Sequence, residues 1–201
     1  TYALAPTFAD VSGHKLFGEL SQALNPDYPQ ADQYLPALRY TAGRDGQPVH
    51  YVVIHTAQGS YAGTISWFRN QQVQASAHYV VSRTGQLTQM VRHSDTAWHA
   101  GNWTYNLRSI GIEHEGFVDD PGAYTQAMYD KSAALTRFLL DAYSIPRVHP
   151  QRAWPTGPRG VVGHNEVPDP DDADRWGGNG RHKDPCVTID GAQCFWNWTT
   201  Y

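Results

Sequence analysis

Short, nearly continuous apolar runs constrain the fold of this chain more than any other feature of its sequence. Residues 49–55 centre on the run Tyr-Val-Val-Ile, which is typical of a buried strand. The run Val161-Val162-Gly163 is a second, shorter example, and residues 109–115 alternate as a further strand does. His55 ends the first run and His164 follows the second. The pattern therefore predicts strands that deliver histidines at their ends.

The chain between these strands predicts helices and one hairpin. Residues 66–73 are expected to form a short helix, and strands at 78–82 and 86–91 are expected to flank a tight turn. Thr125 is a candidate N-cap for a long helix that ends near Ser144. The fold class that follows is α/β, with a central mixed β-sheet, flanking helices and a loop-rich C-terminus.

The two ends of the chain differ from its middle. Residues 1–47 are predicted to be an N-terminal arm packed on the domain, and residues 48–201 to be one catalytic domain. Within the arm, only four apolar positions fit one face of a short helix. These four positions are Leu16, Phe17, Leu20 and Leu24.

Charge and hydropathy exclude two classes of partner. The formal net charge of −4 at pH 7 argues against electrostatic binding to nucleic acid. No apolar run approaches the ~20 residues that span a bilayer, so we expect no membrane-spanning segment. We take the chain to be a monomer.

Three side chains stand out as candidate metal ligands. His55 and His164 follow predicted strands, and Asp184 lies in the later segment His182-Lys183-Asp184-Pro185. Two imidazoles and one carboxylate, with a fourth position open to water, match a catalytic zinc site. The three residues are far apart in the chain, so spacing alone also leaves open ordinary core or surface histidines.

Several short motifs resemble those of one enzyme superfamily. They are Val53-Ile54-His55-Thr56, Ser76-Ala77-His78-Tyr79, Arg83-Thr84-Gly85, Ala97-Trp98-His99-Ala100-Gly101, Ser109-Ile110-Gly111-Ile112-Glu113, Gly163-His164 and His182-Lys183-Asp184-Pro185. Together they resemble the zinc-dependent N-acetylmuramoyl-L-alanine amidases of the type 2 amidase and peptidoglycan recognition protein superfamily. The resemblance runs from about Val49 to Pro185, with every motif in the family's order.

The resemblance implies a mixed sheet with helices on its faces and a zinc site in a groove at strand ends. Carried over by position, His55, His164 and Asp184 fall on the three zinc ligands. Glu113 falls on a glutamate that bacterial members use in catalysis. His182 falls where many members carry a catalytic lysine and others a histidine.

The same resemblance places four further side chains near the substrate: His78, Trp98, His99 and Asn102.

One position departs from the usual pattern, because members commonly carry glycine after Asp-Pro and this chain carries Cys186. Glycine accepts a positive φ and cysteine does not do so easily. Some members use cysteine as the third ligand, so Cys186 is a rival to Asp184. We prefer Asp184, because Cys186 has a bonding partner in Cys194.

The function that the resemblance implies is hydrolysis of the amide bond between N-acetylmuramic acid and L-alanine in bacterial peptidoglycan. Zinc would supply a water of lowered pKa, Glu113 the base, and His182 a donor to the developing oxyanion. One alternative is a recognition module that binds muropeptides without cutting them. A second is a glycosidase that uses Glu113 and Glu115, which are two apart on a strand and so share a face.

Cys186 and Cys194 are the only cysteines, and an Asp-Gly turn signal lies between them. Such a turn would bring the two sulfurs together, so we predict a disulfide directly after Asp184. Because a disulfide of this kind is reduced in the cytosol, we expect a secreted, cell-wall-associated protein.

Overall fold

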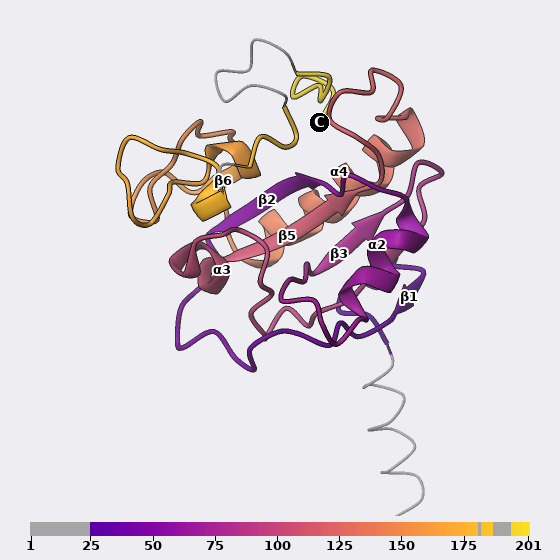
Figure 1. Ribbon diagram of the computed structural model, residues 1–201, viewed down its shortest axis with the longest axis horizontal. Helices are drawn as coiled ribbons and strands as arrows, with labels where there is room; N and C mark the ends of the chain where they lie inside the picture. Colours follow the sequence, from indigo (N-terminus) through magenta and orange to yellow (C-terminus); the bar gives the residue numbers. More distant parts are fainter. Residues whose placement is uncertain (1–24, 181, 187–193) are drawn as a thin grey trace, which may run out of the picture.

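A six-stranded sheet forms the centre of the protein in a computed structural model that describes residues 25–180, 182–186 and 194–201 (Figure 1). The strand order is β1-β4-β3-β5-β2-β6. Strands β3 and β4 pair antiparallel, and the other neighbours pair parallel. The expected mixed sheet is therefore confirmed. Its strands are β1 (Gln33–Tyr34), β2 (Tyr51–Thr56), β3 (Tyr79–Val81), β4 (Leu87–Gln89), β5 (Ser109–His114) and β6 (Gly160–Gly163).

The register of the central strands brings the predicted functional residues to one edge of the sheet. Strand β2 lies between β5 and β6, and all six of its residues are buried. His55 on β2 lies opposite Glu113 on β5, and Ile54 lies opposite Gly163 on β6. Because the three strands are parallel, their carboxyl ends meet at the same edge. His164, the residue after β6, therefore reaches the end of β2.

Helices cover both faces of the sheet. The long helix α4 (Gln126–Ala142) packs on one face, where Leu135 and Leu139 join a core cluster with Ile112 (Figure 1). Burial of each such leucine contributes about 1.5–3 kcal/mol. The predicted N-cap Thr125 accepts a hydrogen bond from the Met128 amide, which contributes about 1 kcal/mol and sets where the helix begins.

The opposite face carries α2 (Tyr61–Phe68) and α3 (Trp103–Arg108). Side chains alternate along a strand, so Tyr51, Val53 and His55 lie on the same face of β2. Tyr51 and Val53 join Tyr105 of α3 in a core cluster. The candidate site therefore lies on the face away from α4.

One local expectation needs correction, and two short elements were not expected. The helix predicted at residues 66–73 is α2, which begins at Tyr61 because the Ser60 hydroxyl accepts a hydrogen bond from the Gly63 amide. The sequence did not predict α3 or β1, because each is too short to give a periodic pattern of apolar residues. The apolar positions expected to form an N-terminal helix lie outside the described residues.

Residues 25–47 contact the sheet closely. Strand β1 pairs with β4, and the buried Arg44 side chain donates to the carbonyl oxygens of His93, Leu107 and Ser109 at 2.6, 3.0 and 3.0 Å. The division of the chain at residue 47 stays a prediction. No helix among the described residues is both long and apolar enough to cross a membrane.

Candidate metal centre

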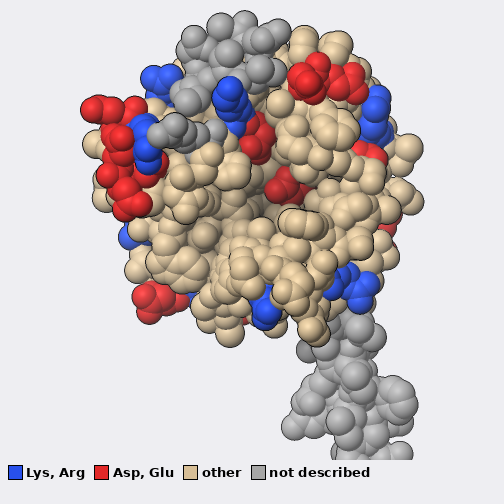
Figure 2. Space-filling model, in the orientation of Figure 1, with Lys and Arg blue, Asp and Glu red and all other residues tan. Residues whose placement is uncertain are grey.

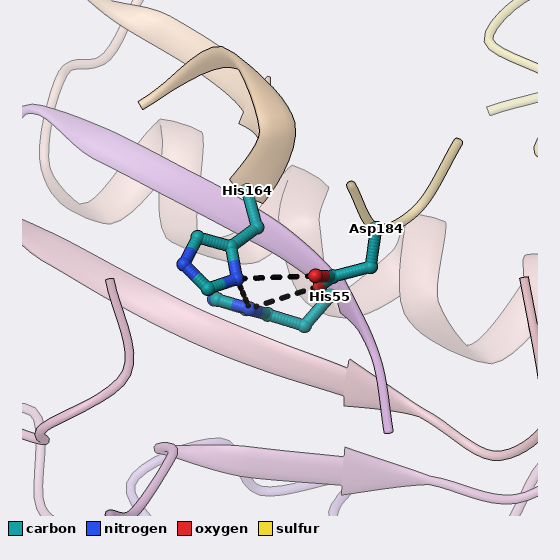
Figure 3. Close-up of side chains that lie close together, drawn as sticks. All are labelled: His55, His164 and Asp184. Carbon is teal, nitrogen blue, oxygen red and sulfur yellow. Dashed lines mark hydrogen bonds and ion pairs between the residues drawn. The ribbon is translucent and has the colours of Figure 1, made fainter. Parts of the chain in front are cut away.

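Three side chains from distant parts of the chain meet at the end of β2. The Nδ1 atoms of His55 and His164 lie 3.0 Å apart. Asp184 places Oδ2 3.4 Å from Nδ1 of His55 and Oδ1 3.3 Å from Nδ1 of His164. Both rings and the carboxylate point toward one another (Figure 3). All potential ligand atoms lie within 4.8 Å of one another, a grouping that can hold a metal ion.

Backbone contacts join the segments that carry these side chains. The Asn165 amide donates to the Asp184 carbonyl at 2.8 Å, and the Thr56 amide donates to Oδ2 of Asp184 at 3.2 Å. Gly163 has no side chain, and a Cβ atom there would lie 2.8 Å from Cδ of Pro185. Glycine at this position therefore allows the loop that carries Asp184 to approach the end of β6.

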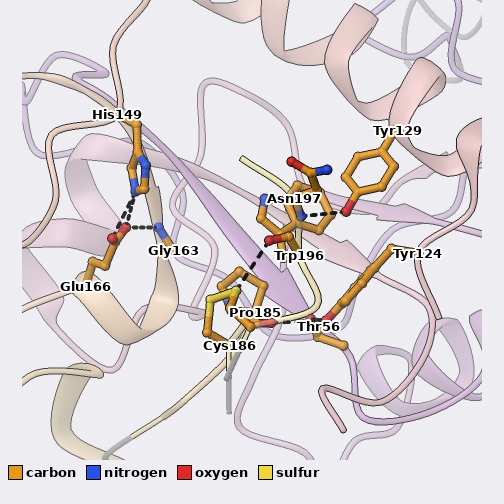
Figure 4. The surroundings of a disulfide bond; sticks show 11 residues. Thr56, Tyr124, Tyr129, His149, Gly163, Glu166, Pro185, Cys186, Trp196 and Asn197 are labelled. Carbon is orange, nitrogen blue, oxygen red and sulfur yellow. Dashed lines mark hydrogen bonds and ion pairs between the residues drawn. A yellow bond between two sulfur atoms is a disulfide. The ribbon is translucent and has the colours of Figure 1, made fainter. Parts of the chain in front are cut away.

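A buried carboxylate fixes the short 3-10 turn that begins with His164. Glu166 accepts a hydrogen bond from the Gly163 amide at 2.7 Å and pairs with His149 at 2.7 Å (Figure 4). Glu166 is only 7% exposed, so both contacts are shielded from water. These two contacts fix the backbone of the first turn after β6, and with it the position of the His164 Cα and Cβ atoms.

The predicted disulfide between Cys186 and Cys194 is present and follows Asp184 closely (Figure 4). The sulfur of Cys186 is therefore not a free thiolate that can serve as a metal ligand. Cys186 is not among the described non-glycine residues with positive φ, so its turn does not need glycine. The expected Asp-Gly turn lies outside the described residues. On the other side, the Tyr124 hydroxyl donates to the Pro185 carbonyl at 3.2 Å.

The electrostatics of the cluster suit metal ligation. Burial, followed by the neighbouring His164, lowers the pKa of His55 to about 4, so the ring is neutral at neutral pH. Burial alone would raise the pKa of Asp184, but His164 and His55 outweigh it and lower that pKa well below its usual value. A neutral imidazole and an ionised carboxylate are the forms that bind metals.

Glu113 lies beside the cluster with an unusual carboxyl group. Its Oε1 is 4.0 Å from Nδ1 of His55, while its buried Oε2 has no hydrogen-bond partner among the described residues. Burial and then the negative charge of Asp184 raise the pKa of Glu113 well above its usual value. An upward shift moves the pKa of a carboxyl group in the direction that suits general acid–base catalysis. Glu115 instead accepts the Arg83 amide at 2.8 Å and does not line the groove.

A groove of about 490 Å³ opens directly above the cluster. The face in Figure 2 is hollowed at its middle, with acidic atoms inside the hollow. The lining of the groove includes residues of α2 and of the loop before it, and residues of the segment at 98–99. Trp98, His99 and His182 line the groove together with the cluster and Glu113. Their expected roles in substrate binding and catalysis stay predictions.

His182 lies at the edge of the cluster. Its ring stacks on His164, with ring centroids 4.1 Å apart, and its Nδ1 is 3.9 Å from Oδ1 of Asp184. The side chain is 47% exposed, so it borders both the cluster and the open groove. Burial, followed by the positive charge that His164 can carry, lowers the pKa of His182.

Two of the four residues predicted to contact substrate, His78 and Asn102, are buried, and their role toward substrate stays a prediction. His78 is fully buried, and its Nδ1 accepts the Gly111 amide at 3.0 Å. Asn102 is the N-cap of α3, where it accepts the Tyr105 amide and donates to the Pro168 carbonyl at 2.9 Å. Neither residue lines the groove. These two side chains fix backbone beside the site, while Ser76, Trp98 and His99 from the same segments line the groove.

The sequence analysis did not identify the wall formed by α2. Trp67 is 58% exposed and lines the groove, as do Ser60 and Thr64. No short motif marks this wall. The only signal was an apolar helical segment, which by itself predicts packing.

The sequence profile of the family described as "N-acetylmuramoyl-L-alanine amidase" matches residues 45–187, which include the three cluster residues and Glu113. The chain belongs to the N-acetylmuramoyl-L-alanine amidase family. The strands and the loop that meet at the cluster all lie within the matched region.

Parts of the chain are also similar in sequence to individual amidases. The chain is 52% identical over 89 residues to N-acetylmuramoyl-L-alanine amidase A of Achromobacter lyticus, covering 44% of this chain and 49% of that protein. It is 44% identical over 77 residues to 1,6-anhydro-N-acetylmuramyl-L-alanine amidase AmpD of Escherichia coli, covering 35% and 41%. The matches thus span less than half of these relatives' length.

A solved structure agrees in fold. The crystal structure of Staphylococcus aureus hydrolase AmiA in complex with its ligand superposes with a TM-score of 0.60, covering 92% of this chain and 85% of that one. Sequence identity is 19%, so this likeness concerns the fold alone.

Proposed function

We propose that this protein is a zinc-dependent amidase that hydrolyses the bond between N-acetylmuramic acid and L-alanine in bacterial peptidoglycan. One observation carries the proposal. A buried His-His-Asp cluster and a carboxyl group of raised pKa, Glu113, share one groove in a chain of the amidase family. Relatives that match parts of the chain are named as amidases of this bond.

The residues present fit a zinc ion. Two imidazole nitrogens and one carboxylate are a common protein ligand set of catalytic zinc, which keeps a further position open. His55, His164 and Asp184 would hold the ion, and they face the groove where an open position is needed. When bound, zinc supplies a Lewis acid for the amide carbonyl and a water of lowered pKa.

Glu113 moves the protons of the reaction. Its carboxylate accepts a proton from the attacking water as the new carbon–oxygen bond forms. It then gives that proton to the alanine nitrogen as the carbon–nitrogen bond breaks. The products are a carboxylic acid on the muramic acid side and a free amine on L-alanine. Oε2 of Glu113 has no hydrogen-bond partner in the part of the chain that the structure describes, which leaves one oxygen available for this transfer.

His182 and the groove walls act on the substrate itself. His182 is half-exposed beside the cluster, where a ring N–H can donate to the carbonyl oxygen as negative charge develops. Trp98 and His99 contact the sugar or the first residues of the peptide from one wall. The partner is therefore a muropeptide or intact peptidoglycan.

The two alternatives have weaker support. A recognition module that does not cut needs no competent metal cluster, yet all three ligand positions are filled and buried. A glycosidase needs a second carboxylate across the scissile bond. Glu115 accepts a hydrogen bond from the Arg83 amide and does not line the groove, so it cannot serve as that second carboxylate.

The disulfide supports a place of action outside the cytosol. A bond between Cys186 and Cys194 persists in oxidising compartments and is reduced in the cytosol. We therefore place the protein in the secreted, cell-wall-associated fraction, where it works as a monomer on peptidoglycan.

Digestion of purified peptidoglycan tests the proposed reaction. We expect new amino-terminal L-alanine without new reducing ends, loss of this activity with a chelator, and recovery when zinc is added. Release of reducing ends in place of amino groups would establish the glycosidase. Tight binding of muropeptide without cleavage by the zinc-loaded protein would establish the recognition module.

A further inference from the structure

A chain of buried hydrogen bonds holds the outer nitrogen of His55, on the side away from the metal cluster. Nε2 of His55 lies 2.9 Å from Nδ1 of His99. Nε2 of His99 lies 3.1 Å from the hydroxyl oxygen of Ser109. That hydroxyl lies 2.6 Å from the carbonyl oxygen of Tyr105. Ser109 is fully buried and His99 is 9% exposed, so the chain is shielded from water.

The last contact sets the direction of the others. A carbonyl oxygen only accepts, so the Ser109 hydroxyl donates to Tyr105 and accepts from Nε2–H of His99. A second proton on His99 would create a buried charge, and no acidic side chain among the described residues forms an ion pair with this ring. Nδ1 of His99 is therefore an acceptor, and Nε2–H of His55 donates to it. Neutral His55 then carries its lone pair on Nδ1, which faces His164 and Asp184.

We propose that His99 is a positioning residue for the metal centre, which through Ser109 fixes the proton of His55 on Nε2 and keeps Nδ1 free for the metal. This inference rests on the proposed function, because it assumes a metal in the cluster. It gives His99 a role beyond the groove surface that it also lines.

The surroundings of His99 are shaped to hold its ring against β5. A Cβ atom on Gly111 would lie 2.6 Å from both Cγ and Nδ1 of the His99 ring, so only glycine leaves room for the ring there. The Asn106 side chain accepts the amides of His99 and Ala100 at 3.1 and 2.8 Å, which fixes the backbone beneath the ring. Gly111 of the Ser-Ile-Gly-Ile-Glu motif thus leaves the room that the His99 ring needs to reach His55.

The two histidine ligands differ in this respect. Nε2 of His164 is buried and has no hydrogen-bond partner among the described residues, whereas Nε2 of His55 is held by His99. Outer hydrogen bonds of this kind orient a ligand ring and increase its affinity for the metal. The orientation of the metal centre therefore depends on His55 and the residues behind it.

Zinc affinity, measured by competition with a chromophoric chelator, tests the proposal without any substrate. His99→Leu removes the acceptor, and we expect zinc affinity to fall roughly 10–100-fold. His99→Asn keeps an oxygen near the position of Nδ1 and should retain most of the affinity. His93→Leu is the matched control, because His93 is equally buried, bonds the Tyr79 hydroxyl and does not contact the cluster.

Three results would overturn the proposal: unchanged affinity in His99→Leu, an equal loss in His99→Asn, or an equal loss in His93→Leu. Nitrogen NMR of labelled histidine in the metal-free wild-type protein gives a measurement that does not depend on variants folding. We expect the protons of His55 and His99 on Nε2, and a proton on Nδ1 of either ring would contradict the inference. The expected pattern of zinc affinities in a protein that does not cut peptidoglycan would contradict the proposed function alone.

Discussion

The cluster of His55, His164 and Asp184 is held by two different kinds of structure, a sheet on one side and a loop on the other. His55 and Glu113 lie opposite each other on adjacent parallel strands of the buried sheet. Asp184 lies in a loop that is held by a disulfide and by scattered hydrogen bonds from Asn165 and Thr56. On the sheet side, the backbone ladder alone fixes the spacing of the two side chains. On the loop side, contacts with residues far away in the chain fix the position of Asp184. Substitutions should therefore affect the two sides differently.

Replacing Glu113 with glutamine should have the largest effect, because it removes the proton acceptor from the sheet side. We expect kcat to fall by about 10²–10⁴ while zinc content stays at the wild-type level. Glutamine has the same shape, and the β2–β5 ladder fixes its position. Amino-group release from peptidoglycan and elemental analysis of the same sample provide the two measurements.

Glu115→Gln is the matched control for this change, since Glu115 follows the same strand and bonds the Arg83 amide. It should leave kcat close to the wild-type value. A large loss in Glu115→Gln with normal activity in Glu113→Gln would show that the catalytic carboxylate is assigned wrongly.

On the loop side, His182→Ala should lower kcat by about 10²–10³ through loss of a donor to the oxyanion. His182 is half-exposed, and it stacks on His164 and lies 3.9 Å from Asp184 without belonging to the ligand set, so its removal should not release zinc. His182→Lys places an ammonium donor at the same position and should recover part of the activity relative to His182→Ala. Loss of zinc from His182→Ala would instead indicate a structural role at the cluster.

Much of the sheet side could be predicted from the sequence. The buried run at 51–54 and the alternation at 109–115 predict β2 and β5, because strands depend on local patterns of apolar residues. The predicted start of α4 after Thr125 is confirmed for a similar reason, since an N-cap is a local signal. The start of α2 was missed, although Ser60 caps it in the same way.

The finer arrangement of the site could not be predicted in this way. His78 and His99 both belong to motifs of the resemblance, yet one is fully buried and only the other lines the groove. Both rings contact Gly111, His78 through the Gly111 amide and His99 where a Cβ atom would lie, and such contacts between separate segments set which ring is covered. Sequence motifs identify such residues without showing which way they point.

Removing the disulfide should weaken the loop side selectively. Cys186 and Cys194 are eight residues apart, and closing a loop this short contributes roughly 2–3 kcal/mol to the free energy of unfolding. We expect the double substitution to serine to lower stability by about this amount and to lower zinc affinity, because Asp184 lies two residues before Cys186. Urea unfolding and zinc competition measure the two effects. Unchanged zinc affinity would mean that other contacts position Asp184.

Replacing the buried His93 should produce the smallest effect, which is a change in how strongly acid destabilises the fold. Burial lowers the pKa of His93 to about 4, whereas an unfolded histidine titrates near pH 6.5. Between these values the unfolded chain binds more protons, so stability decreases as the pH falls from 6.5 toward 4. From pH 7 to 5.5 we expect this one residue to cost about 1 kcal/mol of the free energy of unfolding. His93→Gln cannot titrate, so urea unfolding at the two pH values should show a smaller loss for the variant by that amount. An equal loss in both proteins would mean that His93 is already protonated in the folded state, and that its contact with the Tyr79 hydroxyl tolerates the charge.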